Sequence, residues 1–187
     1  RNDAHSPSNA AGGPSVPKPT KKPTKKHTAK TPRAVKATND VEAYGNRFLD
    51  CTPATKEALA DVADALAISI PTTLARLLLT CGGGRPEKGY FLGDEYEVEV
   101  GRLLAVRVPE GSKRESLELA RPRLVARSGL PTSLVPFALD TGNANFFCVD
   151  LATHEVVYFL LDEPGRAPKR IAPSLELFLE GLDSPPY

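Results

Sequence analysis

The sequence predicts an α+β domain in which helices pack on one face of an antiparallel sheet, preceded by a disordered tail rich in lysine and proline. Three observations support this fold class. Residues 1–40 contain almost no large apolar side chain, two amphipathic helical patterns follow, and several strand-like runs come next, joined by short linkers. Short linkers favour antiparallel neighbours. We therefore expect a tail or linker over residues 1–46 and a folded domain over residues 47–187.

The tail separates charge along the chain. Residues 1–38 carry nine basic side chains and one acid, a net charge of +8, so the overall charge of +1 leaves −7 for residues 39–187. A segment of this composition cannot bury enough surface to offset the entropy of ordering. Two interpretations stay open: a solvated linker, or a segment that binds polyanions by counterion release. The tail has no interleaved aromatic side chains for base stacking.

Two helices are expected next. In "TPATKEALADVADALAI", Thr52 is the expected cap and Pro53 the first helical residue. In "SIPTTLARLLLTCGGG", Pro71 opens the second helix and the glycines at 82–84 end it. The expected apolar faces are Leu59, Val62 and Leu66 in the first helix and Leu74, Leu77, Leu78 and Cys81 in the second.

The period then changes to that of strands. "EYEVEV" alternates Glu95, Glu97 and Glu99 outward with apolar residues inward, which indicates a half-buried strand. Gly101 is expected to turn the chain, so that residues 103–108 pair back as a hairpin. Residues 113–124 are expected to form a short helix that Pro122 ends or bends.

The last third of the chain predicts three strands and a helix. The strand candidates are residues 134–139, 146–151 and 156–161. In "PSLELFLEGL", one helical face carries Leu175, Phe178, Leu179 and Leu182.

Between the first two of these strands lies "DTGNAN", which we call the polar loop (residues 140–145). It does not fit a calcium loop of the EF-hand type, because its third position is Gly142 and its twelfth is Leu151. Its residues are typical turn formers. A turn and a functional surface loop both remain open.

Motifs for catalysis are missing. The glycines at 82–84 follow a helix and lack Gly-Lys-Ser/Thr, and there is no G-x-S-x-G elbow. His154 lies in an expected turn, and Cys148 lies in an apolar run that disfavours a thiolate. Neither catalytic residues, nor a cofactor site, nor metal ligands are predicted, and we expect a protein that is not an enzyme.

Two features bear on location. The three cysteines have no C-x-x-C spacing and sit among apolar residues, which favours reduced thiols in a cytoplasmic protein. The sequence also has no apolar run of about 18 residues, so no membrane span is expected.

The order of motifs resembles the SUKH superfamily, the Smi/Knr-like proteins, from about Ala54 to Leu182. The motifs that carry the resemblance are "SIPTTLARLLLTCGGG", "LVPFALDTGNANFFCVDL", "EVVYFLLDE" and "IAPSLELFLEGL". Members are known as bacterial immunity proteins and as fungal cell-wall regulators, and they share no catalytic residues. The resemblance implies a non-catalytic protein-binding domain that neutralises a cognate bacterial toxin by direct contact, basic nucleases being one class of such toxins.

A domain of charge −7 suits a cationic partner. The expected contact residues are Glu95, Glu97, Glu99, Asp140, Asn143 and Asn145. The alternatives are a regulatory scaffold whose tail recruits other proteins and a nucleic-acid-associated protein that makes weak polyanion contacts through the basic tail.

Overall fold

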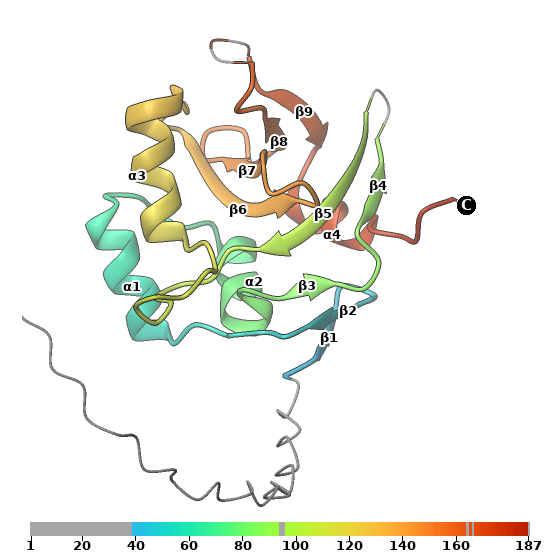
Figure 1. The fold of residues 1–187 in the computed structure, drawn as a ribbon, viewed down its shortest axis with the longest axis horizontal. Coiled ribbons are helices and arrows are strands. Elements are labelled where there is room, and N and C mark those ends of the chain that lie inside the picture. Colours follow the sequence, from blue (N-terminus) through green and yellow to red (C-terminus); the bar gives the residue numbers. More distant parts are fainter. Residues whose placement is uncertain (1–38, 94–95, 164, 166, 187) are drawn as a thin grey trace, which may run out of the picture. The chain divides into compact units, whose positions relative to one another are not determined.

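A computed structural model describes residues 39–93, 96–163, 165 and 167–186 (Figure 1). The expected tail lies outside these residues, apart from its last segment, 39–46. Four helices and nine strands form the described fold, and the strands belong to a three-stranded and a six-stranded sheet. The predicted α+β class is confirmed.

The small sheet was not predicted. It joins β1 (Val41–Ala43), β2 (Asn46–Leu49) and β3 (Arg85–Pro86) in antiparallel order. The first two strands meet at Tyr44 and Gly45, which both have positive φ angles, as a tight hairpin requires. The hairpin starts before residue 47, where the sequence placed the beginning of the folded domain. The strands are short and Tyr-Gly is an uncommon turn dipeptide, so the order of apolar and polar residues did not predict this hairpin.

Helix α1 (Lys56–Ala65) begins later than expected. Thr55, rather than Thr52, caps it, and the Thr55 hydroxyl accepts a hydrogen bond from Ala58 N at 3.1 Å. Thr52 instead donates from its backbone N and its hydroxyl to Gly82 O, at 2.6 and 3.1 Å. The second prediction is confirmed, since α2 (Thr72–Cys81) follows Pro71 and ends at Gly82.

The large sheet is antiparallel throughout, in the order β4-β5-β6-β7-β8-β9. Its strands are β4 (Tyr90–Leu92), β5 (Glu97–Leu103), β6 (Leu134–Asp140), β7 (Phe146–Asp150), β8 (Val156–Phe159) and β9 (Lys169–Ala172). The expected strands β6, β7 and β8 are confirmed. Short β4 and β9 were not predicted.

The expected turn at Gly101 is wrong. β5 runs through Gly101 to Leu103, and its pairing with β6 shifts register between Val100 and Arg102. This irregularity is a β-bulge. A Cβ at Gly101 would lie 2.5 Å from Asp140 O, so the glycine allows the two backbones to approach rather than reversing the chain. Residues 103–108 consequently form no hairpin with β5.

Apolar side chains cover both faces of the large sheet. Phe147 and Val149 of β7 belong to one core cluster, whereas Phe146 and Cys148 belong to the other, as alternation along a strand requires. The first cluster includes side chains of α1, α2 and α4 (Leu175–Glu180), which agrees with helices on one face. The second includes side chains of α3 (Leu117–Ser128), which lies along β6 in Figure 1, so one helix covers the other face.

The helix expected over residues 113–124 is α3, which begins at Leu117 and ends at Ser128. It continues beyond Pro122, so of the two expected effects of the proline, an end of the helix at this point is wrong. The preceding residue, Arg121, is only 9% exposed and anchors the helix. Its guanidinium donates to Leu134 O, Leu66 O and Thr132 O at 3.2, 3.3 and 2.6 Å. Burial lowers the pKa of Arg121. Three carbonyl acceptors therefore hold a buried cation between α1, α3 and β6.

Candidate functional site

The polar loop connects β6 to β7, and Asp140 organises it. The Asp140 carboxylate accepts hydrogen bonds from Ala144 N at 2.9 Å, Asn145 N at 3.3 Å, Asn145 Nδ2 at 2.9 Å and Tyr158 Oη at 2.8 Å. Burial raises the pKa of Asp140, but these hydrogen bonds outweigh burial and the net pKa is lowered. The loop is thus closed around an ionised carboxylate.

Asn145 extends this network to the next strand. Its Oδ1 accepts a hydrogen bond from Leu161 N at 3.0 Å, and its Nδ2 also lies 3.2 Å from Tyr158 Oη. Burial and the hydrogen bond to Asp140 raise the pKa of Tyr158 to about 12. Asp140 and Asn145 are half-buried, and their side chains are engaged inside the fold.

Three of the other expected contact residues, Asn143, Glu97 and Glu99, have exposed side chains. Asn143 is exposed at the tip of the polar loop, with a φ angle of 54° that asparagine tolerates well. Glu97 and Glu99 are exposed on β5, alternating with buried Val98 and Val100 as predicted. Glu95 lies outside the described residues.

The structure brings β5 and the polar loop together. Thr141 Oγ1 lies 3.4 Å from Glu99 Oε2, and Val100 is the β5 partner of Asp140 in the sheet. On the neighbouring edge strand, Leu92 pairs with Glu97 and is 68% exposed. We call this surface, formed by Leu92, Glu97, Glu99 and Thr141, the acidic face.

The side chains that nucleophilic catalysis or metal binding would require are separated from one another or buried. Cys51, Cys81 and Cys148 are free and buried. Burial raises the pKa of all three, that of Cys81 to about 12. His154 is exposed in a turn. Within the described ranges, no three His, Cys, Asp or Glu side chains cluster as a metal site would require, and no helix is long and apolar enough to cross a membrane.

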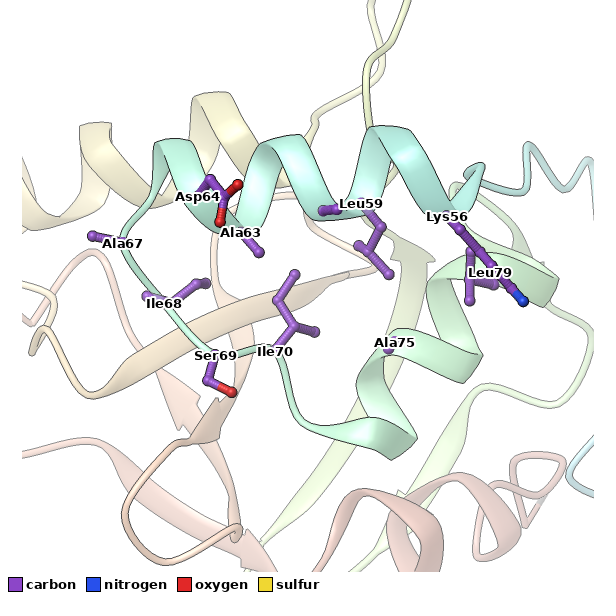
Figure 2. Close-up of a pocket in the computed structure, with 11 residues that line it drawn as sticks. Lys56, Leu59, Ala63, Asp64, Ala67, Ile68, Ser69, Ile70, Ala75 and Leu79 are labelled. Atoms are coloured by element: carbon purple, nitrogen blue, oxygen red, sulfur yellow. The ribbon is translucent and has the colours of Figure 1, made fainter.

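An apolar groove between α1 and α2 was missed by the sequence reasoning. It has a volume of about 690 Å³. In Figure 2, Leu59 and Ala63 point from α1 toward the groove, and Ile70 lies opposite them. Ala60 and Ala63 of α1 line this groove, and their small side chains leave room beside the helix.

Comparison with known proteins places the chain in a family. A search of curated proteins found no match. The family model described as "SMI1 / KNR4 family (SUKH-1)" matches residues 53–181, a range that includes all four helices and the entire large sheet. It also includes the polar loop and the acidic face. The chain therefore belongs to the SMI1/KNR4 family (SUKH-1).

Proposed function

We propose that this protein is an immunity-type binding protein, which neutralises a basic toxin by stoichiometric contact and catalyses no reaction. The observation that carries the proposal is the acidic face beside a rigid loop, in a domain of a family whose members bind partner proteins. The expected partner is a cationic protein, with a basic nuclease as one class.

Charge supports the acidic face as the contact surface. Glu97 and Glu99 are exposed, project from the same side of β5, and face no cation at ion-pair distance among the described residues. Residues 39–187 carry a net charge of −7. A field of this sign accelerates encounter with a basic protein. Leu92, on the edge strand β4, adds exposed apolar area to the same surface.

Preorganisation supports the polar loop as the second part of the contact. Ordering a loop on binding costs free energy, which a loop already fixed in the free protein avoids. Asp140 and Asn145 fix the loop through internal hydrogen bonds, and they leave Asn143 exposed at its tip. In this proposal Asn143 makes contact, whereas Asp140 and Asn145 contribute by holding it.

The test uses the product of the gene adjacent to that of this protein. Co-expression in a bacterial host should restore growth, and the purified pair should form a one-to-one complex by light scattering. The double variant Glu97→Lys/Glu99→Lys should associate about tenfold more slowly, because it reverses the steering field. Adding Glu95→Lys should increase the loss.

A matched control reverses two glutamates elsewhere. Glu57 on α1 and Glu180 on α4 are exposed, and the variant Glu57→Lys/Glu180→Lys changes the net charge by the same amount. It should retain most of the association rate. Equal rates for the two double variants would refute the acidic face, and turnover of a substrate by the purified protein would refute the non-catalytic mechanism.

A further inference from the structure

A basic pocket of about 500 Å³ lies beside the polar loop, and residues of β5, β6 and β7, of the segment that precedes α3 and of the middle of α3 line it. Its charged lining consists of Arg102, Lys113, Arg114 and Arg123 with one acid, Glu115. Arg123 is paired with Glu115, with Nη1 3.3 Å from Oε2. The lining side chains therefore carry a net charge of +3, in a part of the chain, residues 39–187, whose net charge is −7.

Two of these cations are held by neutral oxygens. Arg102 is half-buried, and its Nη1 donates to Gly83 O at 2.9 Å. Arg114 Nη1 lies 3.4 Å from Asp50 O and 3.3 Å from Thr52 Oγ1. Burial lowers the pKa of Arg102, the charge of Arg114 lowers it further, and the charge of Asp50 opposes them. Carbonyl and hydroxyl oxygens position the guanidinium groups without neutralising them.

Without a bound anion, cations that lie this close together destabilise the folded protein. Desolvation and like-charge repulsion both disfavour the charged form of Arg102. An anion in the pocket would relieve both. Arginine is well suited to this task because its planar fork of donors matches the oxygens of a phosphate.

The remaining lining residues indicate the chemistry of the rest of the ligand. Leu139, Phe146 and Leu161 supply apolar surface, and Asn143 supplies an amide at the rim. Pockets for small molecules have volumes of about 300 to 1,000 Å³, apolar walls and a few placed polar groups. The volume and the apolar wall of this pocket fit that description, and most of its polar groups are positively charged side chains.

We propose that the basic pocket binds a phosphate-bearing small molecule of the size of a nucleotide. The phosphate groups contact Arg102, Lys113 and Arg114, and the apolar part lies against Leu139 and Phe146. Asn143 belongs to both this pocket and the polar loop, so an occupied pocket also contacts the tip of the proposed partner-binding loop.

The test is calorimetric titration of the full chain with ADP at low ionic strength, beside pyrophosphate and adenosine. ADP should bind one to one, pyrophosphate more weakly, and adenosine not at all. Arg102→Gln and Lys113→Gln should each weaken ADP binding about tenfold, since each removes a charge-assisted contact. Lys113 is exposed, so its variant decides the matter even where Arg102→Gln fails to fold.

Two controls separate the pocket from general attraction of anions. Arg76→Gln removes an exposed arginine of α2, outside the pocket. A variant with glutamine at Lys21, Lys22, Lys25 and Lys26 lowers the charge of the tail. Both should bind ADP as the unchanged protein does. The proposal is overturned if ADP does not bind, if neither pocket variant weakens binding, if the tail variant abolishes it, or if a glutamate-rich peptide binds the pocket more tightly than ADP.

Discussion

Replacing Asp140 with asparagine should loosen the polar loop while changing the side-chain volume very little. Asp140 Oδ1 accepts the bonds from Ala144 N and Asn145 N, and Oδ2 accepts those from Asn145 Nδ2 and Tyr158 Oη. If the asparagine keeps its oxygen at the first position, its NH₂ group faces two donors. A hydrogen bond to a charged group contributes about 1.5 to 3 kcal/mol, and the tyrosine hydroxyl can rotate to accept one bond back.

The expected loss is therefore about 2 to 3 kcal/mol in the free energy of unfolding at pH 7. Urea unfolding followed by circular dichroism measures it, and the melting temperature should fall by about 4 to 12 °C. Asp64→Asn, on the exposed side of α1, is the matched control and should change stability by less than about 0.5 kcal/mol.

A double-mutant cycle with Tyr158→Phe isolates one bond of the network. The single Tyr158→Phe change should cost about 1 to 2 kcal/mol, and the pair with Asp140→Asn should cost less than the sum, because both changes remove the same contact. An additive result would mean that the 2.8 Å contact between Tyr158 Oη and Asp140 contributes nothing.

The effect of Asp140→Asn should depend on pH. Because the folded pKa of Asp140 is lowered, its stabilisation is present above the unfolded value of about 3.9 and is lost as the pH falls through the folded pKa. The two proteins should converge in acid. Tyr158, with a folded pKa of about 12, gives stability that is present below about pH 10 and is lost as the pH rises through 12. If Asp140→Asn matched the unchanged protein at pH 7 within about 0.5 kcal/mol, the carboxylate would not be what holds the loop.

Three further perturbations test other parts of the molecule. Gly101→Val should lower the free energy of unfolding by at least about 2 kcal/mol, because its Cβ would lie 2.5 Å from Asp140 O, whereas Gly142→Ala, whose Cβ meets nothing closer than 3.6 Å, should be nearly neutral in the same urea titration. The three buried thiols should react with iodoacetamide at pH 8 far more slowly in the native protein than in urea, and equal rates by mass spectrometry would contradict their burial. Deleting residues 1–38 removes a net charge of +8 and should abolish retention on heparin while leaving complex formation with the partner intact, and retention by the truncated protein would show that polyanions bind elsewhere.

Patterns of apolar residues were the part of the sequence that predicted the fold well. Helix α2 has its apolar residues at i, i+3, i+4 and i+7, and all four are buried. The runs that became β6 and β7 are almost entirely buried because both faces of the sheet are covered. A strand that is apolar on both faces predicts two covering layers. That signal pointed to α3 on the second face, and the expectation of helices on a single face overlooked it.

Local signals failed where tertiary contacts decide. Thr52 and Thr55 both suit a helix cap, and the choice between them depends on Gly82, 30 positions away, whose carbonyl binds Thr52. The edge elements β1, β3 and β4 have two or three residues each, too few for a period of two to be visible. The alternating glutamates of β5 were predictable, but the pairing of the polar loop with Glu99 needed the register of β5 against β6.

The sequence also did not predict the pockets, because segments that are far apart in the chain form them. Arg102 and Arg123 are 21 positions apart, and they belong to a strand of the large sheet and to the helix that covers its second face. In the sequence they are isolated cations in a chain whose basic residues are concentrated in the tail, and charge counting assigned the folded part to cationic partners alone.

The bulge at Gly101 connects the acidic face to the basic pocket. Val98 and Val100 point into the first core cluster, and strict alternation would send Arg102 after them and Leu103 to the opposite side. The shift of register between Val100 and Arg102 reverses this order. Leu103 joins the core, and Arg102 stays on the side that carries Glu97 and Glu99. One additional residue in a strand thus avoids a buried arginine and sets a cationic pocket next to an acidic surface, with the polar loop between them.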